Sequence, residues 1–145
     1  MAFSQKTLIS FQRAHRSILL SLDRIQGVSR LYSQAKLGVC QLNDHVLNHL
    51  SRQDETFYQS LRDFYASHRE SLKMLEFLTH DLKDLKIKYL VFSEKHSGAM
   101  GDLGARSFIK DFGEFKQDLV ERIEMEENYL FPLLDGVIRS MDQGS

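Results

Sequence analysis

Apolar residues recur every three or four positions through most of the chain, and this spacing constrains the fold more than any other feature. Alternation with a period of two, which would indicate β-strands, does not persist in the sequence. The single proline among 145 residues leaves long stretches free to remain helical. The pattern therefore predicts an all-α protein.

The apolar series divides into four helical segments separated by turn signals. We predict these segments at about residues 4–26, 37–65, 67–96 and from 105 to past 131. A glycine-rich loop over 97–104 separates the last two, and Pro132 should kink or restart the final helix. Long amphipathic helices with short connections predict an antiparallel up-down-up-down four-helix bundle, formed as one domain over residues 1–145.

Composition excludes several classes of protein. The formal net charge of -1 argues against a strongly basic nucleic-acid binder. No apolar run approaches the roughly 20 residues of a membrane span, and Met1–Ser10 does not resemble a signal peptide. The single cysteine, Cys40, excludes an internal disulfide, fits a reducing compartment and is expected to be buried. These features predict a cytoplasmic protein that contacts neither a membrane nor nucleic acid.

Polar residues interrupt the inward-facing positions of three helices. They are His15 in the first segment, His49 and Gln53 in the second, and Arg122 and Glu126 in the fourth. Such residues are costly on a buried line unless they are paired or bind a ligand. Counting residues from each predicted turn places His15, His49, His80 and Arg122 at one level of the bundle, with Gln53 and Glu126 one turn further along.

The remaining histidines are less well placed. His80 has the right depth but points away from the apolar face of its own helix, and His68 points nearer the core but lies at a helix start. His45 and His96 are expected on solvent-facing or flanking positions. The choice between His80 and His68 stays open on this pattern alone.

Imidazole and carboxylate groups that project into a bundle core suit iron, manganese or zinc. The candidate metal ligands are His15, His49, His80 and Glu126. Arg122 is always protonated and cannot be a ligand, so we expect a buried ion pair with Glu126. The simpler interpretation of His15 and His49 is that they are hydrogen-bonded core residues.

At these residues the chain resembles the hemerythrin-like (HHE cation-binding) superfamily. That family carries His, three residues and Glu, followed by an apolar-Pro ending, on its second and fourth helices. The segment from Glu126 through Leu130, Phe131 and Pro132 matches the ending, His49 matches one motif histidine, and His15 matches the histidine of the first helix. The resemblance covers about residues 8–137 and implies an iron site in the bundle core. Arg122 stands where that family has a ligand histidine, and Gln53 stands where it has a glutamate.

The chain also resembles the regulator-of-sigma-D (Rsd/AlgQ) anti-sigma family, which is a helical bundle of similar length. The shared patterns are the run 46–51 followed by Phe57 and Tyr58, and Arg122 followed by acidic pairs up to Glu127. This second resemblance implies a metal-free module that binds a sigma factor.

Three hypotheses follow from these patterns and resemblances. The first is a hemerythrin-like protein with an incomplete cation site and a sensing or regulatory role. The second is the anti-sigma module, and the third is a scaffold whose polar layer only fixes packing. The sequence contains no glycine-rich phosphate loop and no Ser-His-Asp pattern. Under each of the three hypotheses we expect a protein that is not an enzyme.

Overall fold

The part of the chain that the structure describes is helical almost throughout. The structure is a computed structural model that describes residues 3–27, 32–96 and 104–143. Its elements are α1 (Gln5–Gly27), α2 (Tyr32–Ser51), α3 (Glu55–Phe64), α4 (Arg69–His96), α5 (Gly104–Met125), the π-helical segment η1 (Glu126–Leu130) and α6 (Phe131–Gln143). These ranges contain no strand, so the predicted all-α class is confirmed.

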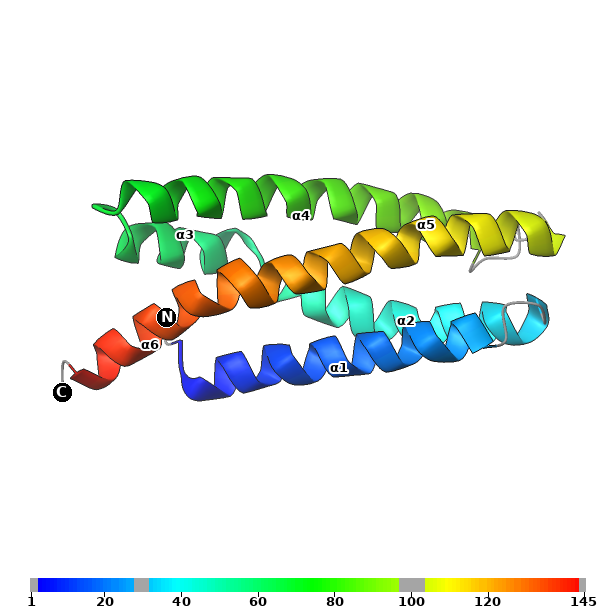
Figure 1. Ribbon diagram of the computed structural model, residues 1–145, viewed down its shortest axis with the longest axis horizontal. Helices are drawn as coiled ribbons and strands as arrows, with labels where there is room; N and C mark the ends of the chain where they lie inside the picture. Colours follow the sequence, from blue (N-terminus) through cyan, green and yellow to red (C-terminus); the bar gives the residue numbers. More distant parts are fainter. Residues whose placement is uncertain (1–2, 28–31, 97–103, 144–145) are drawn as a thin grey trace.

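The helices form four rods that run alternately up and down (Figure 1). The rods are α1, then α2 with α3, then α4, and finally α5 with η1 and α6. The first rod packs against α2 on one side and against α5 and α6 on the other, while α4 packs against α5, α2 and α3. This arrangement is the predicted antiparallel four-helix bundle.

The core follows from the apolar spacing of each helix. Ile18, Leu22 and Ile25 of α1 are at most 1% exposed, as are Leu75 and Leu78 of α4. Burying a side chain of this size contributes about 1.5–3 kcal/mol. The α4–α5 contact is aromatic, with the rings of Phe92 and Phe115 stacked at 4.9 Å between centroids. Burial of these stripes fixes which face of each helix turns inward.

The second predicted segment is two helices rather than one. It begins at Tyr32 instead of near Leu37, and it breaks after Ser51. Asp54 caps the new helix, because its Oδ1 accepts a hydrogen bond of 2.8 Å from the backbone N–H of Phe57. The break leaves Gln53 between the two helices, where its side chain is 1% exposed.

Pro132 restarts the last rod in an unusual way. A proline has no N–H and its ring would collide with the carbonyl four residues earlier, that of Asn128. The chain widens into the π-helical segment η1 just before it, and the N–H of Phe131 bonds to the carbonyl of Glu126. The prediction that Pro132 kinks or restarts the helix is therefore confirmed, because α6 begins at Phe131. Glu126 is the first residue of the π-helical segment η1. π-Helical turns are frequent at functional sites.

Some details differ from the sequence predictions. Cys40 is exposed instead of buried. His96, expected at a flanking position, is 0% exposed because the end of α4 packs against Phe108 of α5. The predicted loop lies outside the described residues over 97–103, and Gly104 already belongs to α5. Within the described ranges, no helix combines the length and apolar content that crossing a membrane requires.

Candidate metal centre

The five polar residues on the predicted inward lines are all buried. Their exposed fractions are 2% for His15, His49 and Arg122, 1% for Gln53 and 0% for Glu126. They come from three of the four rods, at the level of the bundle where α2 ends and η1 begins. Buried polar groups need partners, so the contacts of this layer define what it can do.

Two imidazoles meet one carboxylate oxygen at the centre of the layer. Nε2 of His15 and Nε2 of His49 each lie 2.7 Å from Oε1 of Glu126. The two Nε2 atoms are 3.2 Å apart. Among the described residues, these three form a group whose donor atoms lie close enough together to hold a metal ion.

Aromatic rings fix the orientation of both imidazoles. The ring of Phe131 stacks on His15 at 5.1 Å between centroids, with 14° between the ring planes. Phe11 meets His49 edge to face at 5.3 Å. Phe131 is the residue before Pro132, so the restart of the last rod also sets the stacking partner of His15.

The positions of the ring protons follow from the chemistry of the carboxylate. An ionised carboxylate only accepts hydrogen bonds, so both imidazoles must donate from Nε2 to Glu126. The Nδ1 atoms of His15 and His49 are buried and have no hydrogen-bond partner in the described structure. Nδ1 of His15 lies 3.5 Å from Oε1 of Glu127, whose side chain is 46% exposed.

The second oxygen of Glu126 faces two other donors. Oε2 accepts hydrogen bonds of 2.8 Å from Nε2 of Gln53 and 2.7 Å from Nε of Arg122. Burial favours the neutral acid, but the hydrogen bonds from His15 and His49 and the charge of Arg122 hold the pKa of the Glu126 carboxyl well below its usual range. Glu126 is therefore a buried anion that accepts four hydrogen bonds.

Arg122 is hydrogen-bonded through every nitrogen of its guanidinium. Nη1 donates to the carbonyl of Leu78 at 2.8 Å and to Oδ2 of Asp81 at 3.1 Å. Nη2 donates to Oε1 of Gln53 and to the hydroxyl of Tyr58, both at 2.9 Å. With the bond from Nε to Glu126, all five N–H groups are used. The expected ion pair between Arg122 and Glu126 is present within one helical turn, at 2.7 Å.

Tyr58 closes this network and was not predicted as part of it. Its hydroxyl donates to Oε1 of Gln53 at 2.8 Å while it accepts from Arg122. Burial raises the pKa of Tyr58 to about 12, against the opposing effect of the nearby Arg122 charge. Apolar spacing does not predict this contact. The capped start of α3, rather than a helix continued from α2, sets the direction of the Tyr58 side chain.

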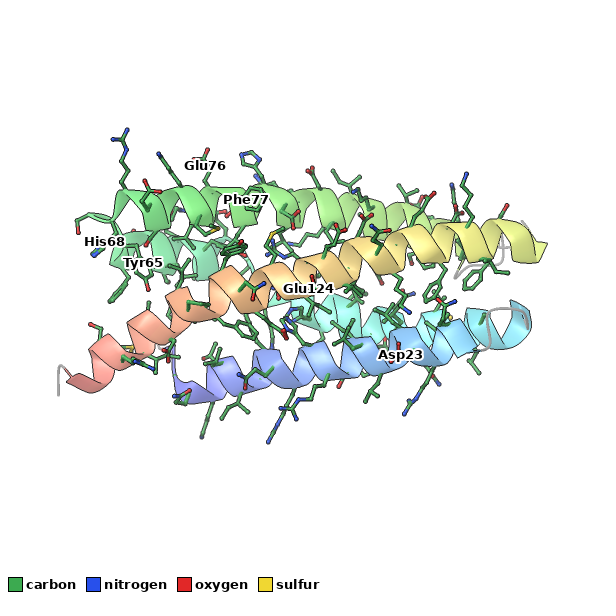
Figure 2. All side chains as sticks on the ribbon, in the orientation of Figure 1. Asp23, Tyr65, His68, Glu76, Phe77 and Glu124 are labelled. Atoms are coloured by element: carbon green, nitrogen blue, oxygen red, sulfur yellow. The ribbon has the colours of Figure 1, made fainter. Side chains whose placement is uncertain are left out.

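His80 does not join the cluster. Its side chain is exposed on α4, and the next residue, Asp81, is the one that reaches Arg122. Successive helical residues differ in direction by about 100°, so correct depth does not make up for wrong direction. His68 is also exposed, beside the start of α4 at one end of the bundle (Figure 2).

The separations between the donor atoms of this cluster suit a metal ion. Donors about 2.1 Å from an ion and at right angles to each other lie about 3.0 Å apart, close to the 2.7 Å and 3.2 Å separations here. Two imidazoles and a carboxylate are a ligand set of non-haem iron. On the other side of Glu126, Arg122 has no lone pair to offer.

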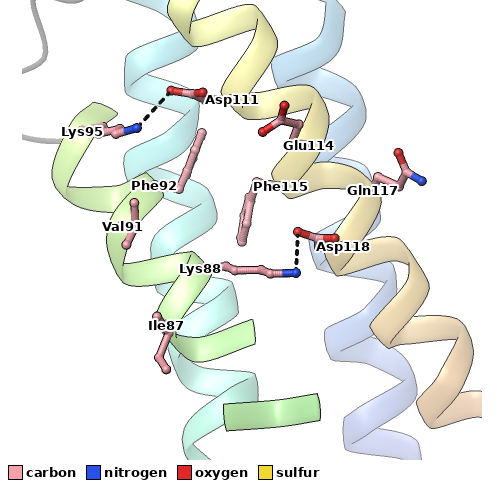
Figure 3. A pocket seen from close by; sticks show the side chains of 10 residues that line it. All are labelled: Ile87, Lys88, Val91, Phe92, Lys95, Asp111, Glu114, Phe115, Gln117 and Asp118. Atoms are coloured by element: carbon pink, nitrogen blue, oxygen red, sulfur yellow. Dashed lines mark ion pairs between the residues drawn. The ribbon is translucent and has the colours of Figure 1, made fainter. Parts of the chain in front are cut away.

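A groove on the described surface is a separate feature. It lies between α4 and α5, has a volume of about 550 Å³, and shares no residue with the polar layer (Figure 3). Its lining residues are Ile87, Lys88, Val91, Phe92, Lys95, Asp111, Glu114, Phe115, Gln117 and Asp118. The candidate site is therefore the buried cluster rather than this groove.

Comparisons with known proteins agree with the geometry. The family model of the hemerythrin HHE cation-binding domain matches residues 10–134, a range that contains His15, His49 and Glu126. Neither the curated proteins nor the solved structures give a significant match.

Proposed function

The chain belongs to the hemerythrin HHE cation-binding domain family, and from this premise we propose that it binds an iron ion at His15, His49 and Glu126. The observation that carries the proposal is the convergence of two imidazole nitrogens on one carboxylate oxygen, each at 2.7 Å, inside the bundle. An ion at this point would replace the two protons that now join the imidazoles to Glu126.

The proton of each ring can move from Nε2 to the other ring nitrogen. Each imidazole would then carry its proton on Nδ1, the atom that has no hydrogen-bond partner at present. For His15, the carboxylate of Glu127 lies 3.5 Å away and would accept that proton's hydrogen bond. Carboxylates in this position orient a ligand histidine and raise its basicity.

We further propose a sensing or regulatory role rather than an enzymatic one. Iron held by two imidazoles and one carboxylate would supply a redox-active centre that can bind small exogenous ligands. Around it, Glu126, Gln53 and Arg122 are already engaged in hydrogen bonds with one another. Gln53 and Arg122 thus hold and orient Glu126, and because both are engaged in this way neither is available as a general acid or base.

Iron reconstitution tests the proposal. Protein loaded anaerobically with ferrous iron and passed through a desalting column should retain iron in stoichiometric amounts, measured by elemental analysis. His49→Ala should lose this iron. His45→Ala is the matched control, because His45 is exposed one turn earlier on the same helix. Wild-type protein without iron, or equal retention by the His49→Ala variant, would contradict the proposal.

A second candidate function is a metal-free regulator of anti-sigma type that binds a sigma factor. It is supported by the closure of the polar layer, since Arg122, Gln53 and Glu126 satisfy one another without an ion. A pull-down with a primary sigma factor tests this candidate. Failure to recover a complex at micromolar concentrations would count against it.

A further inference from the structure

The carboxylate of Glu126 divides its two oxygens between two different surroundings. Oε1 faces the two imidazoles, and Oε2 faces Arg122 and Gln53. A carboxylate that shares its oxygens in this way has room for one cation on each side. On the Oε2 side a cation is already present, and it belongs to the chain.

Arg122 is held too firmly to leave that place. Its side chain is 2% exposed. Its five N–H groups have five partners, of which two lie on α4, two on the rod of α2 and α3, and one on η1. Moving the guanidinium would leave several buried groups without partners, and each costs about 1–3 kcal/mol. The charge itself cannot be removed by deprotonation.

Charge balance leads to the same conclusion. The buried layer contains the anion Glu126 and the cation Arg122, with Asp81 at its edge, 33% exposed. With one divalent ion beside the two neutral imidazoles, the ion, Glu126, Arg122 and Asp81 together carry one excess positive charge. A second divalent ion next to the guanidinium would add two more charges without a new anion, which a buried site does not tolerate.

We propose that Arg122 is a permanent cation of this site, in the place that a second metal ion would take on Glu126, so that the site holds a single metal ion. The proposal rests on the proposed function for the ion at His15, His49 and Glu126. Arg122 acts as a positioning residue: it holds Oε2, so that Glu126 presents only Oε1 to the ion.

Manganese titration distinguishes one ion from two. Mn²⁺ binds to the same imidazole and carboxylate donors, and an isolated ion gives a different electron paramagnetic resonance spectrum from two ions that share a carboxylate. We expect about one Mn²⁺ per wild-type chain, with the spectrum of an isolated ion. Arg122→His combined with Gln53→Glu replaces the guanidinium and the amide by two donors and should bind about two ions with a coupled spectrum.

Gln53→Glu alone is the matched control. It adds the same carboxylate but keeps Arg122 beside it, so it should still bind one ion. Two ions in the wild type or in this control, or one or none in the folded double variant, would overturn the role of Arg122. If the double variant does not fold, the wild-type and control spectra still decide. Wild-type protein that binds no ion would instead refute the proposed function.

Discussion

Replacing Glu126 by glutamine isolates the effect of one buried charge. The amide oxygen can keep the hydrogen bonds from Arg122 and Gln53, which now reach Oε2 at 2.7 Å and 2.8 Å. The new NH₂ group then faces His15 and His49, and both rings can accept from it once their protons move to Nδ1. The hydrogen bonds survive, but Arg122 loses the counter-ion that touches its Nε.

The cost follows from what remains around Arg122. Asp81 is then its nearest carboxylate among the described residues, at 3.1 Å and 33% exposed. Breaking a buried ion pair by removing one partner costs about 3–5 kcal/mol. For a chain of 145 residues the unfolding entropy is about 0.3 kcal/mol/K, so the midpoint of thermal unfolding should fall by about 10–16 °C.

Urea and thermal unfolding in the presence of EDTA measure this cost without a contribution from metal. Glu127→Gln is the matched control and should cost about 0–1 kcal/mol, because Glu127 is 46% exposed. Adding Arg122→Met to Glu126→Gln removes the unpaired charge and should recover part of the stability. A Glu126→Gln variant within about 1 kcal/mol of the wild type, or a double variant that loses the sum of both single effects, would refute this reasoning.

Three further predictions concern other contacts. Gly136→Ala should cost about 1–3 kcal/mol in urea unfolding, because the added methyl group would meet the Tyr65 hydroxyl; Tyr65→Phe in the same background should relieve part of the loss. Asp111→Ala should cost about 1–3 kcal/mol, since it removes the 2.8 Å partner of the fully buried His96; a loss no larger than that of an exposed-site substitution would contradict this. The raised pKa of Tyr58, about 12, means that the unfolded chain ionises first as pH rises. Stability should therefore fall between about pH 10 and 12, and Tyr58→Phe, although less stable below pH 10, should show a smaller fall over that interval.

The direction of the buried polar residues could be predicted from the sequence. Spacings of three and four place His15, His49, Gln53, Arg122 and Glu126 on the inward lines, and all five are buried. The prediction works because long amphipathic helices in a bundle leave little freedom in which face turns inward. Whether His15, His49 and Glu126 bind a metal stays a prediction.

The partners of Arg122 could not be predicted in the same way. Tyr58 lies after a helix break that the apolar spacing does not reveal, because positions 57 and 61 fit a continuous helix equally well. Asp81 is partly exposed on the side of α4. The guanidinium of Arg122 reaches it only because the arginine side chain is long. Helical periodicity predicts which face a residue occupies, whereas these contacts depend on loop geometry and side-chain length.

The π-helical segment fixes the direction of everything that follows it in the chain. A π turn contains one more residue than the α-helix would need, so the chain after it lies where a regular helix one residue shorter would place it. Deleting one of the exposed residues 127–129 should therefore leave α6 against α1 and α3, and Phe131 on the ring of His15. Deleting one residue from the regular part of α5 would instead rotate the rest of the rod by about 100° and turn the apolar face of α6 away from its partners. A one-residue deletion should therefore be far better tolerated in the π turn than in α5.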